Sequence, residues 1–418
     1  GALALPDGAG SFRVNSVQSY GGYVLHVGTL DVGRLAVGAR VDCSVEWGRR
    51  LEISKSHTLT HMMNLALHQV LGDGVSQKGS LVDESKARFD FSHSQAMTPS
   101  ECARVEELVR ESVGAQLPVD IQTVPLDKAL AINNLRAVFG ERYPDPVRVV
   151  SIGPTVPELL AAPDEARWDG FSIELCGGSH VPKTDSLGGF ALVDESAVAK
   201  GVRRVVGVTG QLAADAVAAG AALSSRLDAL TSSDVGAAAA ADVDGARKAL
   251  TQLKLDVDAS TTSIHLKAGL RAAIGAHDKL LQKRAKALSA EGTNAASAAV
   301  AAAASEAATA GKAYVVLEIG GGLEVKAMQP LVQRAIKESA IAVMVLSAAA
   351  DKVSCVAAVP NDRLEQLPAN EWLQQVLSEL NGRGGGKPAQ AQGSGTELAA
   401  VPRALEIARS FANEALTP

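Results

Sequence analysis

The sequence predicts an α+β multidomain protein. The chain has 418 residues, more than one ordinary domain usually holds. Its hydrophobic periodicity changes several times, and after about residue 211 its composition shifts to alanine, serine and charged residues. We therefore expect four parts: a small β-barrel at 1–53, an α+β domain at 54–210, a helical spacer at 211–310 and a small α/β C-terminal domain at 311–418.

The first part is predicted from short alternating runs between residues 11 and 53, separated by glycine-rich turns. A small barrel or meander accounts for them. From Ser56 the period becomes helical, and Gly72 is expected to end this helix. Strands and short helices then alternate up to about Gly210.

The spacer is predicted from alanine-rich stretches with high helix propensity and from the helical stripe in SIHLKAGLRAAIGAHDKLLQKRAKAL. A helical hairpin fits this composition best, and a partly disordered linker fits it less well. From Ala313 strands and helices alternate again, which predicts the separate α/β domain. Within it, Asn381 to Gly395 reads NGRGGGKPAQAQGSG and is expected to form a flexible loop.

Bulk properties restrict the function. The formal net charge of −6 argues against non-specific coating of nucleic acid but permits a local basic face that binds one structured RNA. Four widely spaced cysteines indicate a reducing, cytoplasmic location. No apolar run is long enough to cross a membrane, so no membrane partner is expected. Because the sequence starts without methionine, we expect a piece of a longer protein.

Two pairs of residues carry the chemistry. His57 and His61 lie four positions apart on the predicted helix and so share a face, while Cys176 and His180 flank a Gly-Gly turn. Three imidazoles and one thiolate complete the tetrahedral set that zinc prefers. A Cys176 nucleophile with His180 as its base is the other interpretation, but no oxyanion motif accompanies it, so zinc is favoured.

Several ordered motifs resemble one family. SHTLTHMMNLALHQVLG, VSQKGSLVDESKARFDFSH, ELCGGSHV and GVRRVVGVTG are similar to the editing domain of alanyl-tRNA synthetases and of their free-standing relatives. The barrel-like start resembles the domain that precedes editing, and NGRGGGKPAQAQGSG resembles the family's C-terminal domain. Ser179 stands where the family usually has threonine, which keeps a hydroxyl.

The resemblance implies a zinc-dependent hydrolase that removes serine or glycine wrongly attached to tRNA(Ala). His57, His61, Cys176 and His180 fall on the family's ligands for one zinc ion per chain. Gln77 falls on its editing-site glutamine, and Thr60 on a threonine linked with reading the serine hydroxyl. With four protein ligands zinc would shape the pocket; with one displaced it would activate water.

The resemblance also gives the glycine-rich segment a role. Lys387 is followed by Pro388, so the segment is not a Walker A motif. As a tRNA-contacting loop, Gly384, Gly385 and Gly386 would allow close backbone approach while Arg383 and Lys387 meet phosphate. A homodimer through the C-terminal domain is also implied.

Two alternatives accompany the favoured hypothesis, the C-terminal portion of an alanyl-tRNA synthetase without its aminoacylation core. The first is a free-standing trans-editing deacylase. The second, of another class, is a non-catalytic tRNA-binding or dimerisation module with a structural zinc. Hydrolysis of Ser-tRNA separates this last hypothesis from the two enzymatic ones.

Overall fold

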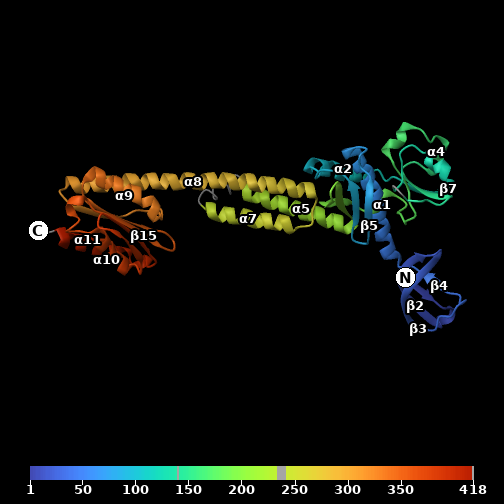
Figure 1. Ribbon diagram of the computed structural model, residues 1–418, viewed down its shortest axis with the longest axis horizontal. Helices are drawn as coiled ribbons and strands as arrows, with labels where there is room; N and C mark the ends of the chain where they lie inside the picture. Colours follow the sequence, from blue (N-terminus) through green and yellow to red (C-terminus); the bar gives the residue numbers. More distant parts are fainter. Residues whose placement is uncertain (139–140, 233–241, 417–418) are drawn as a thin grey trace. The chain divides into compact units, whose positions relative to one another are not determined.

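The computed structural model describes residues 1–138, 141–232 and 242–416 (Figure 1). The chain divides into two compact units, Gly1–Asp278 and Lys279–Pro418. Both units combine helices with β-sheet, which agrees with the predicted α+β class. The boundary falls within the predicted spacer, and the finer division into four domains stays a prediction.

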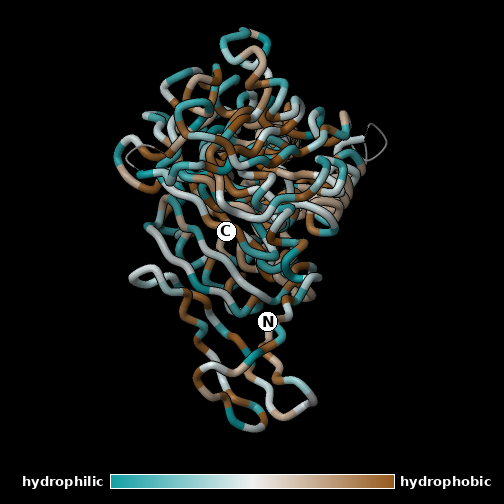
Figure 2. Tube along the Cα trace, turned by 90° about the vertical axis from the view of Figure 1, so that its right-hand side faces the viewer, coloured by the Kyte–Doolittle hydropathy of each residue, from teal (hydrophilic) through white to brown (hydrophobic). Residues whose placement is uncertain are grey.

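The chain begins with an open antiparallel sheet. Its strands are β1 (Ala2–Ala4), β2 (Gly10–Tyr20), β3 (Tyr23–Gly33) and β4 (Asp42–Ser44), in the order β3-β2-β1-β4. The predicted small β-barrel is therefore wrong: β1 and β4 have only three residues each and leave the long strand β3 at a free edge. Polar and apolar residues alternate along these strands (Figure 2), and many of the apolar side chains of β2 and β3 are exposed.

Helix α1 (Trp47–Leu71) organises the rest of the first unit. It begins at Trp47 rather than Ser56, because the stretch between them holds no proline and its only glycine, Gly48, lies in the first turn. The predicted boundary at residue 53 thus falls inside a continuous helix. The helix ends where predicted, at Gly72, whose φ of 85° favours glycine.

Two four-stranded sheets contact α1. The first has the order β11-β12-β6-β5 and the second the order β7-β9-β10-β8. The strands of the first are β5 (Gln77–Val82), β6 (Ala87–Ser92), β11 (Phe190–Ala199) and β12 (Val202–Thr209); those of the second are β7 (Val119–Val124), β8 (Leu135–Arg136), β9 (Val147–Ile152) and β10 (Ser172–Leu175). Leu59, Met63 and Leu67 of α1 pack with Phe89 and Phe91 in one buried cluster. This packing fixes the helix against the first of these sheets.

Short helices complete this body. They are α2 (Pro99–Gly114), α3 (Leu126–Leu130) and α4 (Val156–Ala161), with 3₁₀ turns η1 (Pro6–Gly8), η2 (Ala166–Gly170) and η3 (Thr184–Leu187). Thr98 caps α2: its hydroxyl accepts from the Glu101 backbone N–H while the Glu101 carboxylate accepts from the Thr98 N–H.

The predicted spacer is helical where the structure describes it. It consists of α5 (Gly210–Thr231), α7 (Val243–Ala259) and most of α8 (Ile264–Thr309); residues 233–241 lie outside the described ranges. The alanine-rich composition explains the length of α8, 46 residues, because alanine has the highest helix propensity.

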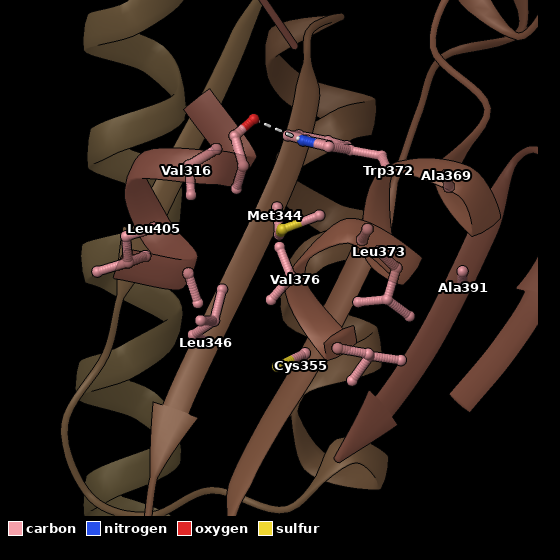
Figure 3. Close-up of a cluster of buried hydrophobic side chains, with 14 of the residues drawn as sticks. Val316, Met344, Leu346, Cys355, Ala369, Trp372, Leu373, Val376, Ala391 and Leu405 are labelled. Atoms are coloured by element: carbon pink, nitrogen blue, oxygen red, sulfur yellow. Dashed lines mark hydrogen bonds between the residues drawn. The ribbon is translucent and has the colours of Figure 1, made fainter. Parts of the chain in front are cut away.

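The second unit is built on a five-stranded sheet with the order β13-β14-β15-β17-β16. Its elements are β13 (Tyr314–Glu318), α9 (Val325–Ser339), β14 (Ala342–Ala348), β15 (Val353–Ala358), η4 (Asn361–Arg363), α10 (Ala369–Glu379), β16 (Arg383–Lys387), β17 (Gln390–Gly395), η5 (Leu398–Ala400) and α11 (Val401–Leu416). Helices α10 and α11 cover one face, where Trp372 donates from Nε1 to the Ala408 carbonyl at 2.8 Å (Figure 3). Helix α9 covers the other face.

The glycine-rich segment is a β-hairpin rather than the predicted loop. Strands β16 and β17 pair from Arg383↔Ser394 to Lys387↔Gln390. Glycine ordinarily disfavours strands, but here it permits close packing: a Cβ on Gly393 would lie 2.6 Å from Leu377 Cδ1 of α10. Low strand propensity therefore misled the sequence-based expectation.

Candidate metal centre

The structure brings the four predicted ligands together. His57 and His61 lie one turn apart on α1, and Cys176 and His180 follow β10, the strand that contacts this helix. One possible ligand atom from each residue lies within 4.8 Å of the other three. The predicted convergence of two distant motifs is thus present in the fold.

Thr58 fixes the tautomer of His180. Its hydroxyl donates to the Ser54 carbonyl at 3.0 Å and accepts from the Val181 N–H at 3.2 Å. The third contact of this hydroxyl, 3.1 Å from His180 Nδ1, must therefore be donated by the imidazole. That leaves a lone pair on Nε2, which is buried and has no hydrogen-bond partner in the described part of the chain. A cation would supply the missing partner.

Glu174 orients the second imidazole. Its Oε2 lies 3.6 Å from His61 Nε2, while its Oε1 accepts from Asn64 Nδ2 at 2.9 Å. The other nitrogen of His61, Nδ1, is buried without a partner among the described residues. A carboxyl group beside one ring nitrogen, with the other nitrogen free, resembles the usual outer-shell arrangement of a metal-binding histidine.

The loop after β10 is shaped around His57. A Cβ on Gly178 would lie 1.9 Å from His57 Cε1, so glycine is required there. Arg148 donates from Nη1 to the Cys176 carbonyl at 2.8 Å and to the Gly178 carbonyl at 2.6 Å. These contacts hold Cys176 Sγ 3.3 Å from His57 Nε2.

Burial prepares the imidazoles as ligands. It lowers the pKa of His61 to about 3 and that of His180 to about 2, with neighbouring imidazoles adding to the effect. The pKa of His57 is lowered too, mainly by burial. All three rings are therefore neutral near pH 7, the form that binds a metal.

The thiol behaves in the opposite way. Burial raises the pKa of Cys176, which favours the neutral thiol until a cation is bound. The two partnerless nitrogens, the neutral rings and the cradle at Gly178 together fit a metal ion. Three nitrogens and one sulfur are a donor set that Zn²⁺ takes.

A pocket lies beside this cluster, with a volume of about 220 Å³. Glu174, which contacts His61, forms part of its wall. Gln77, at the start of β5, also lines it and donates from Nε2 to Ser80 Oγ at a long 3.4 Å. The predicted editing-site glutamine and the candidate metal ligands thus share one region of the structure.

The other predicted residues lie elsewhere. The Thr60 hydroxyl donates to the His57 carbonyl at 2.7 Å, within its own helix, and Thr60 is absent from the wall of this pocket. Arg383 and Lys387 are exposed at the two ends of β16, with Gly384, Gly385 and Gly386 between them. Their predicted roles stay predictions.

Sequence reasoning missed residues that support the site. Thr58, Asn64, Arg136, Arg148 and Glu174 belong to this group. Periodicity contained a signal for two of them. His57, His61, Asn64 and His68 recur at helical spacing and form one polar stripe on α1, and Ser172, Glu174 and Cys176 alternate along one face of a strand.

Comparisons with known proteins place the site in a class. Residues 147–206 match the model of the threonyl and alanyl tRNA synthetase second additional domain, which includes Cys176 and His180. Residues 311–414 match the DHHA1 domain. The chain is therefore similar to tRNA synthetases that carry such additional domains.

Individual relatives narrow the class. The chain is 35% identical to the cytoplasmic alanine--tRNA ligase of Dictyostelium discoideum over 98% of its own length and 43% of the relative. It is 48% identical to the mitochondrial alanine--tRNA ligase of Saccharomyces cerevisiae over 50% of this chain and 21% of that one. The crystal structure of the C-Ala domain from Aquifex aeolicus alanyl-tRNA synthetase matches 23% of this chain and 86% of that chain, at 25% identity and a TM-score of 0.21.

These findings confirm the resemblance predicted from the motifs: the chain is similar to the C-terminal part of the alanyl-tRNA synthetases. It spans about two-fifths of the length of the first full-coverage relatives. Within the described ranges, no helix is long and apolar enough to cross a membrane.

Proposed function

We propose that this chain hydrolyses the ester bond of serine or glycine wrongly attached to tRNA(Ala). The observation that carries the proposal is the convergence of His57, His61, Cys176 and His180 beside a pocket that contains Gln77. The match of residues 147–206 to an additional domain of threonyl and alanyl tRNA synthetases supports the same activity.

The reaction needs little chemical assistance. Water adds to the carbonyl carbon of the aminoacyl ester, and the bond from that carbon to the ribose oxygen breaks. The ribose oxygen takes one proton, and the free amino acid leaves. Because such esters are labile, holding the carbonyl and a water molecule in the correct geometry supplies most of the required rate.

The protein's own residues provide that geometry. The Gln77 amide lines the pocket and is weakly held, so it is available to position the ester or the water. Glu174 and Thr58 keep the imidazoles of His61 and His180 in fixed orientations. His57, His61, Cys176 and His180 would hold zinc, which would supply a positive charge beside the pocket for anchoring the aminoacylated end.

The second unit is proposed to bind tRNA(Ala). Arg383 and Lys387 are exposed at the edge of its sheet and form no ion pair with any described residue. Contacts from such side chains to phosphate raise affinity without reading sequence. Cytoplasmic localisation and a homodimer through this unit stay predictions.

Deacylation of Ser-tRNA(Ala) by the full chain tests the proposal. We expect about one zinc per chain by elemental analysis, hydrolysis by the unmodified protein, and joint loss of metal and activity in Cys176→Ala. Cys43→Ala, which removes an exposed cysteine outside the cluster, is the matched control and should retain both.

Gln77→Ala should lose hydrolysis while retaining metal. A chain that binds zinc and tRNA(Ala) but hydrolyses no Ser-tRNA(Ala) would instead be a binding module with a structural metal. Full zinc retention in Cys176→Ala would refute the ligand assignment.

A further inference from the structure

Two buried polar atoms in the wall of the 220 Å³ pocket have no hydrogen-bond partner in the described residues. One is an acceptor, Asn64 Oδ1, on a side chain whose residue is only 4% exposed. The other is a donor, Arg136 Nε. A buried polar group left unpaired costs about 1–3 kcal/mol, so the pocket requires a ligand or ordered water that both accepts and donates.

The guanidinium of Arg136 is held in place by a hydrogen bond at its Nη2 atom. Its Nη2 donates to Asn134 Oδ1 at 3.0 Å. Asn134 adopts a φ of 61°, and its amide nitrogen donates to the carbonyls of Trp168 and Phe171 at 3.0 and 3.1 Å. These bonds use the far end of the guanidinium and leave Nε available.

A carboxyl group and a guanidinium flank the pocket without direct contact. Arg136 of β8 and Glu174 of β10 are register partners in a parallel pair, and both line the cavity. No ion pair joins their side chains in the described structure. Glu174 and Asn64 Oδ1 provide hydrogen-bond acceptors, whereas Arg136 and Gln77 provide donors.

The size of the cavity restricts its occupant. A volume of 220 Å³ lies below the roughly 300–1,000 Å³ of pockets for drug-sized ligands, so it suits a small group such as an amino acid. The cavity opens to solvent near Ala137, an exposed residue of its wall.

We propose that this pocket holds the aminoacyl group, with Arg136 Nε donating to its carbonyl or hydroxyl oxygen and Asn64 Oδ1 accepting from its α-ammonium. The assignment rests on the proposed deacylation and names the residues that recognise the amino acid. Arg136 is thereby a specificity-determining residue, since a small α-amino acid carries both complementary groups on few atoms.

Binding of a non-hydrolysable ligand to the full chain tests the assignment. The probe is adenosine with serine attached at the 3′ position through an amide, and 3′-amino-3′-deoxyadenosine is the reference without the amino acid. Arg136→Lys keeps the charge but removes Nε, and should weaken binding of the seryl probe by about tenfold to a hundredfold. Binding of the reference should not change.

Arg88→Lys is the matched control. Arg88 Nε is likewise buried without a hydrogen bond in the described part of the chain, but it lies outside the pocket, 3.6 Å from Asp90 Oδ1. Its substitution should alter binding of neither ligand. Ala137→Leu enlarges an exposed residue of the pocket wall, where substitutions usually change stability little, and it should also weaken binding of the seryl probe selectively.

Two results would overturn the assignment: equal losses for probe and reference in Arg136→Lys, or no loss in either variant, as expected if the cavity holds only water. Hydrolysis of Ser-tRNA(Ala) by the unmodified chain separates the two proposals. Selective binding without hydrolysis refutes the deacylase and retains the pocket. Hydrolysis without selective binding refutes the pocket alone.

Discussion

At the scale of single residues, Thr58 joins three parts of the candidate metal site. Its one hydroxyl connects the helix backbone, the loop after β10 and the His180 ring. This role could not be predicted from the sequence, because threonine is a common residue and its position in the helix does not indicate which groups its hydroxyl contacts. The convergence of the four candidate ligands was predictable because few residue types bind zinc, whereas most of the supporting residues are common polar ones whose role depends on contacts.

Replacing Thr58 with valine should weaken metal binding. Valine keeps the side-chain volume but leaves His180 Nδ1 and the Val181 N–H without their acceptor. We expect zinc affinity to fall by about tenfold to a hundredfold, as for other groups that orient metal-binding histidines. Competition with a chromogenic chelator measures this affinity.

Thr60→Val is the control, because its hydroxyl bonds only to the His57 carbonyl of the same helix in the described structure. It should retain the affinity of the unmodified chain. Equal affinity in the Thr58 and Thr60 variants would show that the tautomer of His180 is fixed in another way.

At the scale of elements, hydrophobic periodicity predicted that a helix exists better than it predicted where the helix begins. The apolar spacing from Leu59 onward identified α1 and its end at Gly72 correctly. The start of the helix was misplaced because the preceding stretch carries few of the buried residues that give a periodic signal: Trp47 and Leu51 are exposed. Hydrophobic patterns report burial, and this first part of the helix is not buried.

The cross-strand pair Asp90–Arg204 should stabilise the first sheet in a pH-dependent way. Arg204 donates from Nε and Nη2 to the two Asp90 oxygens at 2.7 and 2.8 Å, between register partners of β6 and β12. These hydrogen bonds lower the pKa of Asp90 below its ordinary 3.8. The stabilisation is therefore present above pH 3.8 and is lost as pH falls through the lower, folded-state pKa.

Asp90→Asn should accordingly reduce the free energy of unfolding near pH 7 by about 1.5–3 kcal/mol, the range for hydrogen bonds to charged groups. The difference from the unmodified chain should narrow as pH falls below 3.8. Urea unfolding followed by circular dichroism measures both. As a control, Asp31→Asn breaks an exposed ion pair with Arg13 and should change stability little. If the stability difference between the unmodified chain and Asp90→Asn stayed constant with pH, the charge of Asp90 would not be its cause.

The glycine-rich hairpin provides a second comparison between neighbouring positions. A Cβ on Gly384 would lie 2.4 Å from the Gln392 carbonyl oxygen, whereas one on Gly385 meets nothing within 4 Å. Gly384→Ala should lower the free energy of unfolding by about 1–3 kcal/mol, as overpacking does. Gly385→Ala should stay within about 0.5 kcal/mol of the unmodified chain. Similar losses in both variants would indicate a general cost of removing glycine from the strand.

At the scale of the whole molecule, composition predicted which parts are helical but could not place them. The alanine-rich region forms α5, α7 and a 46-residue α8 in the described ranges. Composition also could not reveal that the first sheet is open, since closure depends on strand pairing between distant residues. Because the candidate metal centre and the basic strand β16 lie in different compact units, variants in one unit can test each proposed role without changing residues of the other.

Phosphate contacts by the second unit should appear in the salt dependence of tRNA binding. Arg383 and Lys387 stand exposed on β16, the edge strand of the five-stranded sheet, in a chain whose formal net charge is −6. Because the protein as a whole is acidic, these two side chains would attract tRNA only at short range. Their contacts with phosphate would release counterions bound to the tRNA. Replacing both residues with glutamine should raise the Kd for full-length tRNA(Ala) and make its dependence on salt less steep by about two, since each phosphate contact contributes about 0.9 to the slope.

Arg334→Gln is the control in the same unit, because Arg334 is engaged by Glu338 at 2.9 Å on α9. It should leave both affinity and slope unchanged. Hydrolysis of a short seryl acceptor-stem mimic should remain nearly constant in the double variant, because the mimic lacks the phosphates of the tRNA body. If the mimic loses as much as full-length tRNA(Ala), the two basic residues support the fold or a dimer instead. Their proposed role in holding tRNA would then fail, while the metal centre would still account for hydrolysis.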